Sequence, residues 1–147
     1  NKARAEASKK KKQAPEISVE LNTATPEKLE QLSGIGPYYA RQIIKYRELL
    51  GGFVSKSQLL EVHRFKEETY QRIHPQVWAD AGKVKKLNLN TAPFKQILRH
   101  PYFNYYQTKQ IFGLRDKGIA ISGKGQLLEH HIVLEAELEK VLPYLEW

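Results

Sequence analysis

Apolar residues in the first part of the chain recur at the spacing of short amphipathic helices. Leu29 and Leu32 lie three positions apart, and Ala40, Ile43 and Ile44 continue this kind of spacing after a break. Residues three and four positions apart lie on one face of a helix, so each set can bury one side against a core. The pattern predicts two helices joined by a tight turn.

Capping residues indicate where these helices begin and end. Thr25 is a suitable N-cap and Pro26 suits the first helical position, so the first helix is expected to begin there. Pro37 gives the second helix the same kind of start, and Gly51-Gly52 ends it. Ser57 is predicted to cap the helix that follows.

The turn between the first two helices has the sequence Gly34-Ile35-Gly36. Glycine tolerates positive φ and close approach by another molecule, and the apolar Ile35 can point into the core. The amides of the turn and of the helix that starts at Pro37 are then free to face an anion. The sequence therefore predicts a phosphate site built from backbone amides.

The second half of the chain repeats the first half without a gap, at a constant offset that places Leu89 on Leu21. We call this the long offset. The identical segments are Leu21–Ala24 with Leu89–Ala92, Gln42-Ile43 with Gln110-Ile111, and Gln58–Glu61 with Gln126–Glu129. A weaker, short offset, which places Leu59 on Leu29, relates the two parts of the first half. We therefore expect an all-α chain of two tandem modules, each a pair of helix-turn-helix units related by a pseudo-twofold axis.

This repeat divides the chain into a disordered basic tail or linker at 1–16, a first module at 17–77, a linker at 78–85 and a second, degenerate module at 86–147. The net charge is +8, and the tail supplies half of it, with six basic and two acidic residues. The chain has no cysteine, which excludes disulfides and thiolate zinc sites. No apolar run is long enough to span a membrane, so no membrane contact is expected for this part of a longer protein.

Several short segments together resemble the helix-hairpin-helix family, in the tandem form of the ComEA-type competence proteins of DNA uptake. They are Asn22-Thr23-Ala24, Leu32–Gly36, Ile43-Ile44, Tyr46-Arg47, Gly52-Phe53 and Leu59-Leu60. The duplicated arrangement, with His100–Gln107 in place of the second glycine hairpin, is similar to the helix-hairpin-helix domain-containing proteins of Bacteroidetes. The resemblance implies a SAM-domain-like helical bundle for each module. Full-length members of that group tend to carry an N-terminal membrane anchor, which implies a parent protein anchored in the bacterial cell envelope, while the localisation of this part stays open.

The resemblance also implies non-sequence-specific binding of double-stranded DNA, with hairpin amides on phosphates. Carried over by position, the DNA-binding residues are Gly34, Ile35, Gly36, Tyr38, Tyr39, Arg41 and Lys45. Strong DNA binders of the family usually have lysines directly after the proline, whereas this chain has Tyr38-Tyr39. A tyrosine hydroxyl can donate to a phosphate, but it brings no charge and releases no counterion.

The other three hairpins lack the paired glycines. Side chains replace them in His63–Lys66, which argues against close approach of a phosphate there, and His130–Leu134 is expected to be structural. Asn104 is expected to supply positive φ in the first hairpin of the second module. Secondary candidates for DNA contact lie at that hairpin: Tyr102, Asn104, Tyr106 and Lys109.

Catalytic chemistry has no support in the residue pattern, so neither an enzyme nor a cofactor is expected. There is no cysteine nucleophile, no plausible order of serine, histidine and aspartate, and no carboxylate pair at an evident cleft. His130 and His131 are neighbours that would point apart on a helix, so no metal site is expected. His63, His74 and His100 are predicted to cap helix ends or to lie on the surface.

A different function stays open beside DNA binding, namely an interaction or scaffold module. In that case the hairpins serve packing, and tyrosines 38, 39, 105 and 106 bind another protein or a further module of the parent chain. The low net charges of the modules, +1 for 17–75 and +2 for 86–147, and the loss of glycines in three hairpins favour this alternative.

Overall fold

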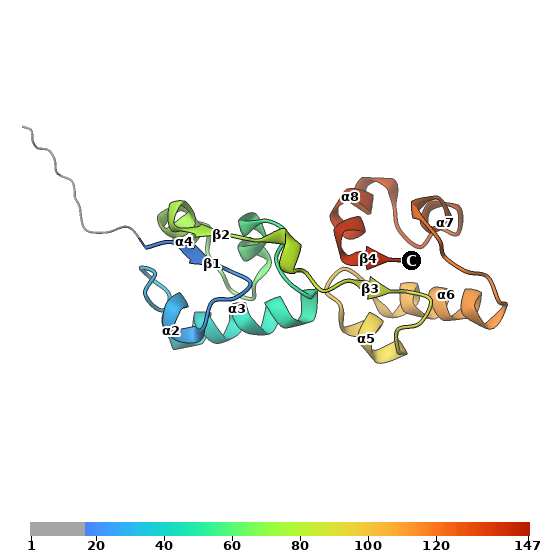
Figure 1. Ribbon diagram of the computed structural model, residues 1–147, viewed down its shortest axis with the longest axis horizontal. Coiled ribbons are helices and arrows are strands. Elements are labelled where there is room, and N and C mark those ends of the chain that lie inside the picture. The colour runs from blue at the N-terminus through green and yellow to red at the C-terminus, as the bar shows by residue number, and fades with distance from the viewer. Residues whose placement is uncertain (1–16) are drawn as a thin grey trace, which may run out of the picture. The chain divides into compact units, whose positions relative to one another are not determined.

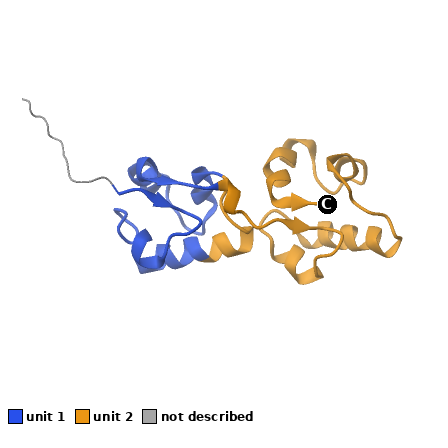
Figure 2. Ribbon diagram, in the orientation of Figure 1, with its two compact units in different colours: residues 1–44, 55–80 blue, residues 45–54, 81–147 orange. Residues whose placement is uncertain are grey.

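The computed structural model describes residues 17–147, and the predicted basic tail at 1–16 lies outside the described residues. The described chain is mostly helical, as the apolar pattern predicts (Figure 1). It forms two compact units (Figure 2). The first comprises the described residues up to Ile44 together with Ser55–Asp80, and the second comprises Lys45–Val54 together with Ala81–Trp147.

The elements up to Trp78 are strand β1 (Val19–Glu20), helices α2 (Pro26–Leu29) and α3 (Pro37–Leu50), a 3-10 helix at Lys56–Glu61, helix α4 (Glu67–Ile73), a 3-10 helix at His74–Gln76 and strand β2 (Val77–Trp78). The later elements are a 3-10 helix at Ala81–Lys83, strand β3 (Leu87–Asn88), helices α5 (Phe94–Arg99), α6 (Tyr105–Asp116) and α7 (Lys124–Glu129), a 3-10 helix at Glu135–Glu137, helix α8 (Leu138–Val141), a 3-10 helix at Leu142–Tyr144 and strand β4 (Leu145–Glu146).

A two-residue strand pair joins the beginning and the end of each repeat. β1 pairs in parallel with β2, with Val19 opposite Val77, and β3 pairs in parallel with β4, with Leu87 opposite Leu145. The second pair therefore repeats the first at the long offset. The sequence could not show these strands as such, because two residues are too few to display the alternation typical of a strand.

The helix starts follow the predicted caps at Thr25 and Pro37. The Thr25 side chain accepts the Lys28 amide at 3.2 Å, and α3 begins at Pro37. The prediction that Ser57 caps the next helix is wrong, because Ser55 is the N-cap. Ser55 begins the helix two residues earlier because the Gln58 side chain accepts the Ser55 amide in return, at 3.1 Å, which completes a capping box.

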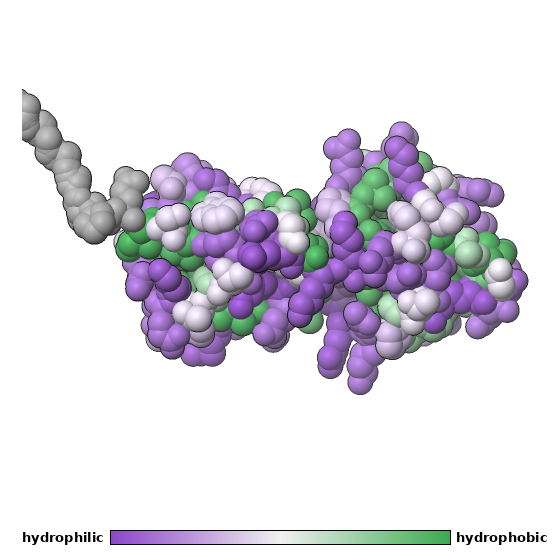
Figure 3. Space-filling model, viewed as in Figure 1, coloured by the Kyte–Doolittle hydropathy of each residue, from purple (hydrophilic) through white to green (hydrophobic). Residues whose placement is uncertain are grey.

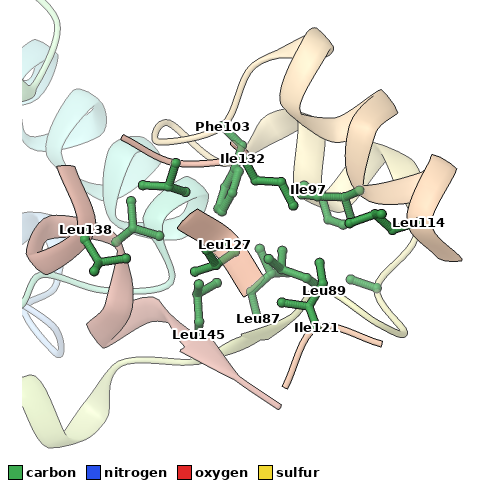
Figure 4. Close-up of a cluster of buried hydrophobic side chains, with 14 residues drawn as sticks. Leu87, Leu89, Ile97, Phe103, Leu114, Ile121, Leu127, Ile132, Leu138 and Leu145 are labelled. Carbon is green, nitrogen blue, oxygen red and sulfur yellow. The ribbon is translucent and has the colours of Figure 1, made fainter. Parts of the chain in front are cut away.

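Each unit has its own apolar core, built mainly from the positions that show helical spacing in the sequence. In the second unit the cluster includes residues from β3, α5, α6, α7, α8 and β4, among them Leu87, Leu89, Leu127, Leu138 and Leu145 (Figure 4). The corresponding buried residues of the first unit are Val19, Leu21, Leu29, Leu32, Ile35, Ala40, Ile43, Leu59, Phe65, Ile73 and Val77.

The repeated Asn-Thr-Ala segment has a structural role in both units. The Asn22 side chain donates to the Asp80 carbonyl at 2.9 Å, and the Asn90 side chain donates to the Ile121 carbonyl at 2.8 Å. Next to Asn22, the carboxylate of Glu20 accepts the Asp80 amide at 2.7 Å. Burial raises the pKa of Glu20, but hydrogen bonds from Asp80, Asn22 and Thr23 together lower it by more, and the net effect is a lowered pKa. The motif thus holds distant parts of a unit together and does not mark a ligand site.

The end of α3 is held by three successive carbonyl groups that accept hydrogen bonds from separate parts of the second unit. The Leu50 carbonyl lies 3.0 Å from His100 Nε2, the Gly51 carbonyl accepts the Lys85 amide at 2.8 Å, and the Gly52 carbonyl accepts the Tyr144 hydroxyl at 2.7 Å. Leu50 is the last residue of α3, so its carbonyl has no partner within the helix, and the bond from His100 satisfies a group that would otherwise need water. The three bonds fix residues 50–52 in the second unit.

His100 is the C-cap of α5, at a helix end as the sequence suggested, but it does not lie on the surface, because only 5% of its surface is exposed. Its Nδ1 accepts the Tyr102 amide at 3.1 Å, so Nε2 carries the proton and donates to Leu50. Burial lowers the pKa of His100 to about 4, against the opposing effect of the hydrogen bond to Leu50. The sequence could not reveal this burial, because the segment that covers His100 lies far earlier in the chain.

Substitution of Gly51 by alanine is expected to destabilise the protein by about 1–3 kcal/mol. Gly51 has φ +94°, and an added Cβ would lie 2.5 Å from the Lys85 carbonyl oxygen. The matched control is Gly113→Ala in α6, where no atom lies within 4 Å, and a gain of about 0.5–1 kcal/mol is expected. Urea unfolding measures both changes, and equal stability of Gly51→Ala and the unchanged chain would contradict the packing described.

Stability is expected to fall as the pH decreases from 6.5 towards 4, because the unfolded chain binds a proton at His100 that the folded protein binds only near pH 4. The contribution of His100 is complete above pH 6.5, and its loss amounts to about 3 kcal/mol at most. His100→Leu, which introduces the residue found at the matching position 32, should remove this part of the pH dependence. Unfolding curves between pH 7 and pH 4 test this, with the exposed His63→Gln as the control that should retain it.

Candidate functional site

In the Gly34–Gly36 hairpin, one of the two glycines has the positive φ that the sequence allows. Gly34 adopts φ +89°, whereas Gly36 does not have positive φ. An added Cβ at Gly34 would lie 2.5 Å from the side chain of Arg72, whereas at Gly36 it would meet no atom within 4 Å. Gly34 is therefore required by the turn, and Gly36 leaves open space in front of the start of α3.

The amides at the start of α3 are available to an external acceptor. The first intrahelical bond runs from the Ala40 amide to the Gly36 carbonyl at 3.0 Å. Within residues 17–147 the amides of Gly36, Tyr38 and Tyr39 have no acceptor. The amide of Ile35, which the sequence included among the donors, donates to the Leu32 carbonyl at 3.1 Å, so this group closes the turn instead. The open donors lie at the N-terminus of a 14-residue helix, where its dipole favours an anion.

The first hairpin shares a shallow groove with the second hairpin of the same unit. The groove is lined by Gly34, Gly36, Pro37, Tyr38, Tyr39, Arg64 and Lys66. Arg64 and Lys66 were missed as site residues, because the absence of glycines argued against the second hairpin. The sequence could have indicated these two residues, because the short offset places Arg64 on Gly34 and Lys66 on Gly36. Arg64 also has positive φ, +64°, as Gly34 does.

Tyr38 and Tyr39 differ in what they contribute to this groove. The Tyr39 hydroxyl donates to the Arg64 carbonyl at 3.0 Å, and its ring packs edge-on against Phe65 at 5.5 Å. Tyr39 therefore joins the two hairpins, and its hydroxyl proton is donated to Arg64 and not to a ligand. Tyr38 is 42% exposed, and its hydroxyl has no hydrogen-bond partner in the described part of the chain.

The two predicted basic partners, Arg41 and Lys45, lie one helical turn apart on α3, and both are exposed. Neither side chain forms an ion pair or hydrogen bond with another described residue. They do not line the groove, where Arg64 and Lys66 supply the positive charge.

The matching hairpin of the second unit satisfies two of its amides, those of Asn104 and Gln107, within the chain. Asn104 is the N-cap of α6, with φ −118°, so the expectation of positive φ at this residue is wrong. Its side chain accepts the Gln107 amide at 2.8 Å, and the Gln107 side chain accepts the Asn104 amide at 2.8 Å. At the long offset these two amides match those of Tyr39 and Gly36, which stay open in the first unit. The capping box thus occupies two of the donors that a phosphate could use at this helix start.

The other secondary candidates are Tyr102, Tyr106 and Lys109. Tyr102 is half-buried beneath the Nζ of Lys140, which lies 4.4 Å from the ring centre. Tyr106 is 78% exposed, and Lys109 Nζ lies 5.5 Å from the ring centre of Tyr105. The positions that match Arg64 and Lys66 are the apolar Ile132 and Leu134.

The described residues contain no group of three or more histidine, aspartate or glutamate side chains placed to hold a metal ion. No helix in the described part of the chain combines the length and apolar character that crossing a membrane requires. Polar residues cover most of the visible surface of each unit, with apolar side chains in separate patches (Figure 3).

Comparisons with known proteins place the hairpin in a family context. A family model described as the helix-hairpin-helix motif matches residues 15–78. ComE operon protein 1 of Bacillus subtilis is 40% identical over 55 residues, which cover 37% of this chain and 27% of that protein. Endonuclease/exonuclease/phosphatase family domain-containing protein 1 of Danio rerio is 32% identical over 76 residues, which cover 52% of this chain and 14% of that protein. Transcriptional accessory protein Tex of Neisseria gonorrhoeae is 33% identical over 67 residues, which cover 46% of this chain and 9% of that protein.

The chain spans 9 to 27% of the length of these three relatives. No solved structure gives a significant match. The matched residues 15–78 contain both the Gly34–Gly36 hairpin and the Arg64–Lys66 hairpin that meet at the groove. Residues 15–78 therefore match the helix-hairpin-helix motif, and the chain is similar to ComE operon protein 1 over 55 residues.

Proposed function

We propose that this protein binds double-stranded DNA through the phosphate backbone, without reading the base sequence. The observation that carries the proposal is the set of open amides at Gly36, Tyr38 and Tyr39, on residues that line one groove with Arg64 and Lys66. Backbone amides at a helix N-terminus bind phosphate oxygens, and arginine and lysine beside them add charge-assisted hydrogen bonds. Such contacts fix the position of a protein on DNA and carry no base information.

The charge of the groove makes the expected affinity moderate and sensitive to salt. Each cation that neutralises a phosphate releases a counterion, so the slope of log affinity against log salt reports the number of such contacts. Arg64 and Lys66 stand in for the lysines that the family usually places after the proline. Arg41, Lys45 and the lysines at 9–12 would add further non-specific attraction.

The proposal includes the tandem architecture. We propose modules at 17–77 and 86–147 with a linker at 78–85, in which the pseudo-twofold relation brings two hairpins of one module to a common groove. The two modules differ in chemistry at that place: the first has open amides with two cations, and the second has a capping box with apolar neighbours. In this view the hairpin contact with DNA belongs to the first module, as part of a longer bacterial protein of DNA uptake or DNA handling.

A second function, protein binding, is favoured by one feature of the second unit. Tyr106 and Leu134, at the positions that match Tyr38 and Lys66, are 78% and 68% exposed. Exposed aromatic and aliphatic residues beside a self-satisfied hairpin suit a protein partner or another module of the parent chain better than a polyanion. This function does not compete with DNA binding for the groove of the first unit.

Gly36→Asn is expected to weaken DNA binding about tenfold, which corresponds to about 1.4 kcal/mol. Asparagine at this N-cap would accept the Tyr39 amide, as Asn104 accepts that of Gln107, and the net charge stays the same. Because asparagine and glycine differ by only about a few tenths of a kcal/mol at an N-cap, thermal stability should hold or rise slightly.

Fluorescence anisotropy with a labelled duplex measures the affinity of this variant. The control is the reverse change, Asn104→Gly, which opens the second hairpin and should leave the affinity unchanged. Unchanged affinity in a folded Gly36→Asn protein would exclude the hairpin as the DNA site.

Replacement of Arg64 and Lys66 together by glutamine should lower the affinity for duplex DNA at every sequence and reduce the salt slope by about 2. Both side chains are exposed, so the fold should persist. Titrations at several salt concentrations, with two unrelated duplex sequences, measure both effects. The control, Lys117→Gln with Lys124→Gln, removes the same charge from the second unit. An equal loss of DNA affinity in the control would show that the affinity depends only on net charge.

A further inference from the structure

A basic groove lies in the second unit, apart from the hairpins. It runs between the last turn of α3 and helix α5 and encloses about 520 Å³, with residues 85–87 along one side. Four cations line it, Lys85, Lys86, Lys95 and Arg99, against a single carboxylate, that of Glu48. All of these residues belong to the second compact unit, which includes residues 45–54.

The four cations keep their charge available to a ligand. None of them forms an ion pair with any residue in 17–147, and the partner of the Lys86 ammonium is a neutral group, the Pro143 carbonyl at 3.2 Å. Lys95 and Arg99 are four positions apart on α5 and so lie on one face of it. Unpaired cations that line one groove repel one another, and an anion between them removes that repulsion.

The floor of the groove is fixed and uncharged. It contains Leu50, Gly51 and His100, which are held by the hydrogen bonds from His100 to the Leu50 carbonyl and from Lys85 to the Gly51 carbonyl. Leu49 and Pro93 add aliphatic surface to the walls. A groove of this kind is preformed, so binding does not require ordering of its backbone.

The repeat shows that this charge is specific to the second half of the chain. Lys85, Lys86, Lys95 and Arg99 match Ile17, Ser18, Glu27 and Gln31 in the first half, at the long offset. The first half thus has no basic residue at any of these four positions and one acidic residue. Together with the capped hairpin, this places the accessible positive charge of the second unit in a different part of the module from that of the first unit.

We propose that this groove binds the phosphate backbone of a nucleic acid, as a second contact separate from the Gly36 hairpin. Three of the four cations are lysines, which are depleted in protein–protein interfaces and common at phosphates. The cations on both walls can reach successive phosphates, and the aliphatic walls can pack against the sugars. The inference extends the proposed DNA binding, but the contact depends on its own residues.

The test uses the whole chain and a labelled DNA duplex. Lys95→Gln with Arg99→Gln should weaken binding about tenfold at moderate salt and reduce the salt slope by about 2, with unchanged thermal stability. The matched control, Lys117→Gln with Lys124→Gln, should change both quantities by much less. An equal effect of the control pair would overturn the groove as a site.

The same substitutions in a Gly36→Asn background separate the two contacts. Further weakening in that background supports the groove independently of the hairpin. If Gly36→Asn lowers the affinity for DNA and the pair Lys95→Gln with Arg99→Gln does not, the groove is overturned and the proposed function stays intact. If the pair lowers the affinity and Gly36→Asn does not, the groove is supported and the hairpin site is overturned. Inorganic phosphate and an acidic peptide serve as competitors, and groove variants that lose binding to either one but not to DNA would overturn the nucleic-acid assignment.

Discussion

The end of α3 is the constraint on which much of the second unit depends. Three consecutive carbonyls, at Leu50, Gly51 and Gly52, accept hydrogen bonds from His100, Lys85 and Tyr144, which come from three separate parts of the chain. Residue 51 has positive φ, and any Cβ on it would lie 2.5 Å from the Lys85 carbonyl oxygen, so only glycine fits this position. These bonds satisfy the open end of the helix, bury His100 in its neutral form and build the floor of the basic groove.

The N-terminal ends of α3 and α6 determine the chemistry of the two hairpins that precede them. The first amides of a helix need acceptors, and a protein can supply these acceptors itself or leave them to a ligand. The second unit supplies two of them, since the side chains of Asn104 and Gln107 accept each other's amides, whereas the first unit leaves the amides of Gly36, Tyr38 and Tyr39 open. One position, Gly36 against Asn104, therefore decides whether the amide three residues further on is open or is accepted by a side chain of the same turn.

Several basic residues of this protein gather in two grooves, and this location matters more for attracting an anion than the net charge of either module. The modules carry small net charges, which at first favoured a scaffold function over DNA binding. Arg64 and Lys66 nevertheless share a groove with open amides, and Lys85, Lys86, Lys95 and Arg99 share another without an ion pair among the described residues. Cations that lack a carboxylate partner retain their attraction for phosphates, whatever the net charge of the unit.

The sequence by itself determined the helical character, the Thr25 and Pro37 helix starts, the Gly34 turn and the repeat of the first half in the second, because these depend on local preferences and on spacing. It did not determine the strand pairs, the burial of His100, the Asn104 cap or the Arg64–Lys66 side of the groove. Each of these arises from residues that meet only in the folded chain, or from a choice between two local conformations that packing decides. Tertiary structure alone decided which helix amides lack an acceptor in the described chain and which cations stay unpaired there, because both depend on the neighbours that folding supplies.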